Sequence, residues 1–283
     1  MIRLVAIDMD GTLLRPDGHI SERNIRAVKG MQNRGTELLV CTGRSYADAL
    51  EPLEAAGLRA SIVCMNGAAS YDWNGQRMDE NRLAHEQVKE IMDCCQGEEI
   101  IFDFMTDKGS YTTADEGLFR ACFERNVLLP MAEFTYEGVK SRFRFVRAAE
   151  LLKLGLAFYK ISVIHESSNV LGRIKDRLSK VGELAIASSF ATNLELTHAC
   201  AQKGRALAAY AAARGIRPEE MMAIGDSEND YSMLSMDIKY TVAMGNAMES
   251  VKRIAKCQTR SNIQDGVAYA IETLVLAAEA RAY

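Results

Sequence analysis

An acidic, glycine-containing loop follows a short apolar run in the segment Leu4-Val5-Ala6-Ile7-Asp8-Met9-Asp10-Gly11-Thr12. A continuous apolar run of this length is typical of a buried strand in a parallel sheet. Side chains two residues apart at a strand end point the same way, so Asp8 and Asp10 should lie together. Carboxylates so close repel each other unless a cation is present, and hard oxygen ligands favour Mg²⁺. The segment predicts a metal site, although an isolated D-x-D-G-T could also be an ordinary turn.

The pattern of apolar run and polar loop recurs along the chain, with helical segments between the runs. Ser21 is a candidate N-cap of the first helix, and Gly35 a candidate end. Such β-α-β alternation predicts a parallel sheet with right-handed crossovers. We therefore expect an α/β fold, a Rossmann-like doubly wound parallel sheet. Its predicted strands are 4–7, 38–41, 61–65, 221–224 and 240–244, and its later helices are 203–214 and 265–281.

The middle of the chain has a different order of elements. Residues 142–145, Arg-Phe-Arg-Phe, alternate polar and apolar, as in a sheet with one wet face. We predict an inserted α+β domain at 84–189, and a core formed by 1–83 plus 190–283. The predicted strands of the inserted domain are 99–105, 109–113, 142–147, 157–164 and 183–189, and its predicted helices are 85–96, 115–125 and 167–181.

Composition excludes several classes of protein. The 283 residues carry a formal charge of −4, which argues against a nucleic-acid binder. The sequence contains no run of about 18 apolar residues, so no membrane span is expected. Charges interrupt the short apolar stretch near the N-terminus, so no signal peptide is expected there. The seven cysteines are odd in number and form no Cys-x-x-Cys pair, so we expect reduced thiols in a cytoplasmic protein.

Four polar clusters each follow a predicted parallel strand. Active sites of open α/β sheets form at the carboxyl ends of the strands, so clusters far apart in sequence should meet there. A carboxylate that attacks phosphorus forms an aspartyl phosphate, and a second acid must protonate the leaving oxygen. The clusters are Asp8 to Thr12, Thr42-Gly43-Arg44, Asn66-Gly67 and Gly225-Asp226-Ser227-Glu228-Asn229-Asp230.

Together with Lys203-Gly204, the first, second and fourth clusters resemble the four ordered motifs of the haloacid dehalogenase superfamily. Further segments resemble its Cof-like sugar-phosphatase branch, in which a mobile cap is inserted between the second and third motifs. The predicted insertion at 84–189 falls at that place. These segments are Asn66-Gly67-Ala68, Val242-Ala243-Met244-Gly245-Asn246-Ala247 and Asp265-Gly266-Val267-Ala268.

The resemblance implies a role for each matching residue. Asp8 would be the nucleophile and a metal ligand, and Asp10 the general acid and base, bound to the metal through its backbone carbonyl. Asp226 would complete the protein ligands of Mg²⁺, with Asp230 in support. The residues that would bind the phosphoryl group are Thr42, Gly43, Lys203 and Asn229. Arg44 could be only a structural residue at a helix start, and it is left out of the catalytic set.

The expected function is therefore hydrolysis of small phosphorylated metabolites by a Mg²⁺-dependent phosphatase. Sugar phosphates are the default substrates of the branch, and nucleotides or phosphorylated cofactors are alternatives. A phosphomutase of related fold shares the core motifs, and a non-catalytic binding protein is a further alternative. The expected partner is a small phosphorylated molecule, with neither nucleic acid nor membrane, and the expected state is a monomer or homodimer.

Overall fold

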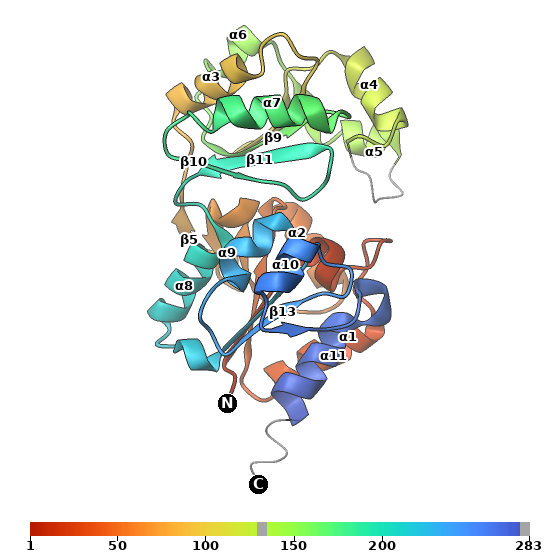
Figure 1. The fold of residues 1–283 in the computed structure, drawn as a ribbon, viewed down its shortest axis with the longest axis vertical. Helices are drawn as coiled ribbons and strands as arrows, with labels where there is room; N and C mark the ends of the chain where they lie inside the picture. Colours follow the sequence, from red (N-terminus) through yellow and green to blue (C-terminus); the bar gives the residue numbers. More distant parts are fainter. Residues whose placement is uncertain (129–134, 278–283) are drawn as a thin grey trace. The chain divides into compact units, whose positions relative to one another are not determined.

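The computed structural model describes residues 1–128 and 135–277. The chain divides into two compact units, one formed by Met1–Glu80 with Gln202–Tyr283 and the other by Asn81–Ala201. The second unit is thus inserted into the sequence of the first (Figure 1).

The first unit is built on a sheet in the order β14-β13-β12-β1-β2-β3-β4-β5. From β14 to β3 the strands are parallel, and β4 and β5 are added antiparallel at one edge. All side chains of β1 are buried, as the apolar run predicts. The strands are β1 Leu4–Ile7, β2 Glu37–Cys41, β3 Ser61–Cys64, β4 Ala69–Tyr71, β5 Arg77–Glu80, β12 Met221–Gly225, β13 Tyr240–Ala243 and β14 Cys257–Gln258.

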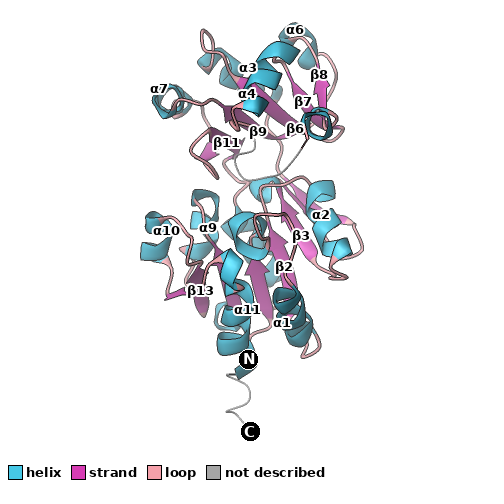
Figure 2. Cartoon of the chain, turned by 90° about the vertical axis from the view of Figure 1, so that its right-hand side faces the viewer, coloured by secondary structure: helices cyan, strands magenta, loops and turns pink. Residues whose placement is uncertain are grey.

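Helices flank this sheet (Figure 2). The Ser21 hydroxyl accepts the Asn24 N–H and caps α1, as predicted. Helix α1 packs against α11, and α8 packs against β2 and β3. The main helices of this unit are α1 Glu22–Gln32, α2 Tyr46–Ala55, α8 Lys203–Ala213, α10 Glu249–Ile254, α11 Gly266–Ala270 and η6 Ile271–Leu276. The short helical segments are η1 Met9–Leu13, η2 Met65–Gly67, η3 Pro218–Glu220, η4 Glu228–Asp230, α9 Tyr231–Leu234 and η5 Asn262–Gln264.

The inserted unit contains its own sheet, in the order β10-β11-β9-β6-β7-β8. Its pairings are antiparallel except that between β7 and β8. Helices α3 and α7 bury Ile91 and Ile174 in a cluster with Phe104 and Ile161 of the sheet. The strands are β6 Ile101–Thr106, β7 Gly109–Thr112, β8 Phe143–Phe145, β9 Phe158–Ile164, β10 Leu184–Ala187 and β11 Asn193–His198. The helices are α3 His85–Cys94, α4 Glu116–Glu124, α5 Tyr136–Lys140, α6 Ala148–Leu151 and α7 Ser168–Leu178.

The α/β class and the doubly wound sheet are confirmed, but some details of the structure differ from the prediction. The predicted boundary at residue 190 lies before β11, which pairs with β9 and β10 and so belongs to the inserted unit. The hairpin of β4 and β5 was not predicted. The predicted helix 265–281 comprises α11 and η6, and residues 278–281 lie outside the described residues. None of the helices within the described ranges is long and apolar enough to cross a membrane.

Candidate active site

The candidate site lies at the carboxyl ends of the parallel strands in the first unit. Strands β1 and β12 are neighbours, and Ile7 pairs with Ile224, so Asp8 and Asp226 follow at the same edge. The chain continues from β1 to β2 and β3 on one side, whereas β13 and β14 extend the sheet on the other side of β12. Ligands of open α/β sheets bind at such a reversal of strand order. The topology therefore brings together two carboxylates 218 residues apart in sequence.

A tight turn follows Asp8 and shapes one side of the site. Asp10 has φ −73° and ψ 122°, and Gly11 has φ 78° and ψ −7°. These are the angles of a type II turn, which needs a residue with positive φ at its third position. A Cβ atom at residue 11 would also lie 2.4 Å from Oδ2 of Asp226. Only glycine allows this approach, and the Thr12 hydroxyl then donates to Asp226 Oδ1 at 2.8 Å.

Lys203 is fully buried at the start of α8. Its ammonium donates to Asp8 Oδ1 at 2.6 Å, to Asp230 Oδ1 at 2.7 Å and to Asn229 Oδ1 at 3.3 Å. Burial alone would lower the pKa of Lys203, but the carboxylates of Asp230 and Asp8 outweigh it, and the pKa is raised. The lysine is therefore a permanent cation directly beside Asp8.

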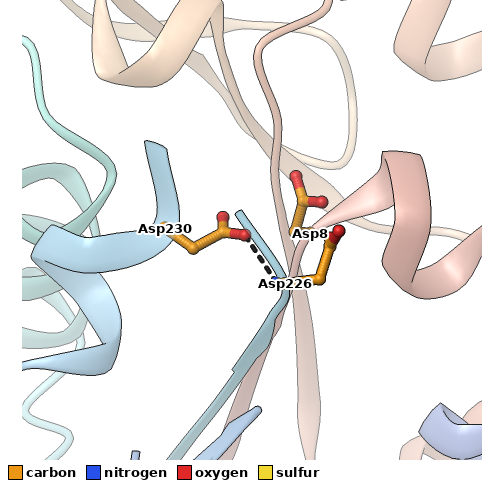
Figure 3. A group of neighbouring side chains, drawn as sticks. All are labelled: Asp8, Asp226 and Asp230. Carbon is orange, nitrogen blue, oxygen red and sulfur yellow. Dashed lines mark hydrogen bonds between the residues drawn. The ribbon is translucent and has the colours of Figure 1, made fainter. Parts of the chain in front are cut away.

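Three carboxylates converge on one point, from Asp8, Asp226 and Asp230. One oxygen of each lies within 4.8 Å of the others, and Figure 3 shows Asp230 reaching from its helical turn toward the two strand ends. Burial and then repulsion by Asp230 raise the pKa of Asp8, and Lys203 only partly opposes them. The same two causes raise the pKa of Asp226 to about 7. The cluster therefore holds more negative charge than Lys203 alone can balance.

Asp230 differs from the other two because hydrogen bonds occupy both of its oxygens. Lys203 donates to Oδ1, and the backbone N–H groups of Asp226 and Ser227 donate to Oδ2 at 2.8 and 3.1 Å. Asp8 and Asp226 each accept a bond at Oδ1 only, within residues 1–128 and 135–277. A buried carboxylate, Asp8, and a half-buried one, Asp226, both with raised pKa values and an oxygen each to spare, fit a hard divalent cation.

The remaining predicted phosphate-binding residues are Thr42, Gly43 and Asn229. Thr42 is fully buried after β2, and its hydroxyl accepts the Arg44 N–H at 3.1 Å. Gly43 lies between them in sequence. The Asn229 amide donates to Asn66 Oδ1 at 3.3 Å, and Asn229 Oδ1 accepts from Lys203. The contact of Thr42, Gly43, Lys203 and Asn229 with a phosphoryl group stays a prediction.

Arg44 is a residue whose place in the site the sequence reasoning missed. Its guanidinium binds the Asp10 carboxylate with two bonds, Nε to Oδ2 at 2.8 Å and Nη2 to Oδ1 at 2.6 Å. The Asp10 side chain is therefore paired with Arg44 and is not part of the carboxylate cluster, contrary to the expectation that it joins Asp8 there. A ligand role for the Asp10 backbone carbonyl stays a prediction. A signal was available, because Arg44 follows β2 at the same sheet edge as Asp10. Thr12, whose hydroxyl donates to Asp226, is likewise a site residue that the sequence motif alone does not single out.

Comparisons with known proteins agree with these motifs. The profile of the haloacid dehalogenase-like hydrolase family matches residues 5–271. Phosphatase YwpJ of Bacillus subtilis is 31% identical, over 97% of this chain and 100% of the relative. The 5-amino-6-(5-phospho-D-ribitylamino)uracil phosphatase YcsE of the same species is 29% identical, over 97% and 96%. A solved haloacid dehalogenase-like hydrolase of B. subtilis superposes with a TM-score of 0.85 at 30% identity, over 97% of this chain and 100% of that one.

These matches run through both units and leave little of the chain unaligned. The family match begins within β1, just before Asp8, and extends beyond Asp226 and Asp230. The resemblance to the Cof-like branch that the motifs indicated is confirmed by relatives that align over 97% of the chain. The chain is an enzyme of the haloacid dehalogenase-like hydrolase family.

Proposed function

We propose that this hydrolase is a Mg²⁺-dependent phosphatase that acts on small phosphorylated metabolites, chiefly sugar phosphates, through an aspartyl phosphate on Asp8. The observation that carries the proposal is the contact of the Asp8 carboxylate with the Lys203 ammonium at 2.6 Å, beside Asp226. A nucleophilic carboxylate must be ionised and must tolerate an approaching anion. A fixed lysine and a divalent cation together meet both needs.

The proposed metal ligands are Asp8, Asp226 and the backbone carbonyl of Asp10. When bound, Mg²⁺ would supply positive charge that lowers the pKa of the two carboxylates and screens the phosphate from Asp8. Asp230 would hold Lys203 and the Asp226 loop in place and would not bind the metal, because its oxygens already accept hydrogen bonds from Lys203 and the backbone of Asp226.

In the first proposed step, an oxygen of Asp8 attacks phosphorus. A bond forms between that oxygen and phosphorus, and the bond from phosphorus to the ester oxygen breaks. Asp10 gives a proton to the departing oxygen, so an alcohol leaves. Thr42, Gly43, Lys203 and Asn229 are proposed to hold the phosphoryl oxygens by hydrogen bonds and charge.

In the second step, water attacks the phosphorus of the aspartyl phosphate. Asp10, now a carboxylate, takes a proton from the water. The bond between Asp8 and phosphorus breaks, inorganic phosphate leaves and the Asp8 carboxylate is restored. Arg44 contributes by fixing the Asp10 carboxylate with two bonds, which limits the positions from which it can exchange a proton.

The inserted unit, residues 81–201, is proposed to be the cap and to select the leaving group. Support comes from its place in the sequence, between Thr42 and Lys203, where the resemblance expects a cap. YcsE is named for a phosphoribityl substrate, which, like a sugar phosphate, releases a polyhydroxylated alcohol. Phosphorylated polyols and sugars are therefore the first compounds to test.

The test is release of inorganic phosphate from a panel of sugar, polyol, nucleotide and cofactor phosphates. We expect turnover with Mg²⁺, none with a chelator, and a loss of at least about 10³-fold in Asp8→Asn. Acid-quenched protein should carry phosphate on wild type but not on the variant. Unchanged turnover in Asp8→Asn would sink the nucleophile assignment. Phosphate transfer to a second sugar with no phosphate release would instead indicate a mutase.

A further inference from the structure

The turn that follows β13 is bonded to both acidic loops of the site. The Met244 N–H donates to the Gly225 carbonyl at 3.0 Å, and the Met248 N–H donates to the Asp226 carbonyl at 2.9 Å. These two bonds fix residues 244–248 against the backbone that carries Asp226.

Asn246, at the middle of this turn, makes the connection to the other loop. Its amide Nδ2 donates to the Gly11 carbonyl at 2.8 Å. Its Oδ1 accepts the Asn262 N–H at 3.0 Å, which fixes the orientation of the amide. Asn246 therefore links the Asp10-Gly11 turn to the backbone of Asp226 through two consecutive contacts.

The point of attachment is significant because of the type II turn. The direction of the Asp10 carbonyl is set by ψ of Asp10 and φ of Gly11, here 122° and 78°. A bond that anchors the Gly11 carbonyl restrains both the position of this turn and its distance from Asp226. The two proposed metal ligands that it relates are the Asp10 carbonyl and the Asp226 carboxylate.

Two other asparagines bind the same loop and provide a comparison. Asn24 donates to the Leu13 carbonyl and Asn262 donates to the Leu14 carbonyl, and both side chains are buried. Their amides satisfy buried carbonyls farther from Asp10, which explains them as parts of the fold. Asn246 is exposed, so burial gives no reason for its bond to Gly11.

We propose that Asn246 is a positioning residue that sets the relative placement of the Asp10 carbonyl and Asp226 for a divalent cation. The inference rests on the proposed Mg²⁺ dependence. It does not make Asn246 a metal ligand, because its Oδ1 is already used by Asn262. Its effect should therefore be seen in metal affinity more than in chemistry at saturating metal.

The experiment measures Mg²⁺ binding to the full chain by calorimetry, without substrate, for wild type and Asn246→Ala. We expect the Kd for Mg²⁺ to rise about tenfold, as for other residues that orient metal ligands. The Mg²⁺ concentration for half-maximal activity should rise equally, whereas kcat at saturating Mg²⁺ and the substrate KM should stay within about twofold. The melting temperature of the metal-free protein should change little, because the side chain is exposed.

Two control variants separate this effect from general loosening. Gln32→Ala removes another bond of an exposed side-chain amide to a backbone carbonyl, that of Arg59, in the same unit, and should leave the Kd for Mg²⁺ unchanged. Asn262→Ala removes the bond to Leu14 and should lower the melting temperature more than it changes that Kd.

An unchanged Kd in Asn246→Ala, with a wild type that binds Mg²⁺ and releases phosphate, overturns the inference alone. An equal rise in all three variants also overturns it. A wild type that binds no Mg²⁺ overturns the inference together with the proposed metal dependence.

Discussion

Replacement of Asp226 by Asn should stabilise the metal-free protein at neutral pH, even though it should abolish Mg²⁺-dependent activity. Burial and the Asp230 carboxylate raise the pKa of Asp226 from 3.8 to about 7. Ionisation of this group is therefore much less favourable in the folded protein than in the unfolded chain. Asn has the same shape, carries no charge and keeps an oxygen for the Thr12 hydroxyl.

The magnitude follows from the pKa shift of Asp226. It is about three pKa units, and each unit corresponds to about 1.4 kcal/mol, so the upper bound is roughly 4 kcal/mol. Relaxation around a charged carboxylate reduces this, and we expect a gain of about 2–4 kcal/mol for Asp226→Asn at pH 8. Between pH 4 and 7 the folded state binds more protons than the unfolded state. The stability of the wild type, relative to the variant, should therefore fall as pH rises through this window.

The assay is urea unfolding at pH 5, 6, 7 and 8 in a chelator, with the free energy of unfolding from linear extrapolation. Asp237→Asn is the matched control, because Asp237 is exposed and Lys256 lowers its pKa, so its removal should bring no gain. Added Mg²⁺ should then stabilise wild type but not Asp226→Asn, since only the former binds it.

Equal stability of wild type and Asp226→Asn at pH 8 without metal would contradict this prediction. A stability difference that does not shrink as the pH falls from 8 to 5 would contradict it as well. Groups whose pKa is lowered, such as Glu98 and Glu220, contribute in the opposite direction only below about pH 4.5 and are common to both proteins.

Three further substitutions test other contacts of the site. Lys203→Met should lower the free energy of unfolding by about 3–5 kcal/mol at neutral pH, because it leaves buried carboxylates without a cation. Because the pKa of Asp8 is raised, this loss should shrink as the pH is lowered and Asp8 takes up a proton; urea unfolding at several pH values checks both. Arg44→Lys keeps the charge but loses the two-bond contact with Asp10, so kcat should fall about tenfold or more with KM little changed, in steady-state kinetics. Gly11→Ala places a residue with a side chain at positive φ, and its Cβ would collide with Asp226. It should destabilise the fold by roughly 2 kcal/mol and weaken Mg²⁺ binding, measured by urea unfolding and calorimetry.

Much of the fold was predictable because hydrophobic runs of the right length define buried parallel strands. The edge at which Asp8, Thr42 and Asp226 gather follows from that alone, since the carboxyl ends of parallel strands meet at one edge. Strand β11 was missed although Asn193 to Thr197 alternate polar and apolar residues. Leu194 and Leu196 face the apolar cluster of the inserted sheet, and such a pattern does not tell which sheet the strand joins.

Which residues form the site was easier to predict from the sequence than which of them contact one another. The contact of Lys203 with Asp8 joins residues 195 apart in sequence, and whether a lysine in the first turn of a helix points inward depends on how the helix packs against its neighbours. The bond of Arg44 to Asp10 depends on the rotamers of two exposed or half-exposed side chains. Sequence periodicity carries information about faces of elements, not about which donor satisfies which carboxylate.

The three clustered carboxylates show how partners divide one residue type into different roles. Asp230 is fully buried, yet Lys203 and two backbone N–H groups donate hydrogen bonds to its carboxylate, so its negative charge contributes to the stability of the fold. Asp226 accepts a hydrogen bond from one hydroxyl and has a raised pKa, so its negative charge destabilises the folded protein when no cation is bound. Asp8 stands between them, paired with Lys203 but still raised in pKa. Removing charge at Asp226 should therefore stabilise the metal-free protein, whereas removing it at Asp230 should leave Lys203 underpaired and destabilise it.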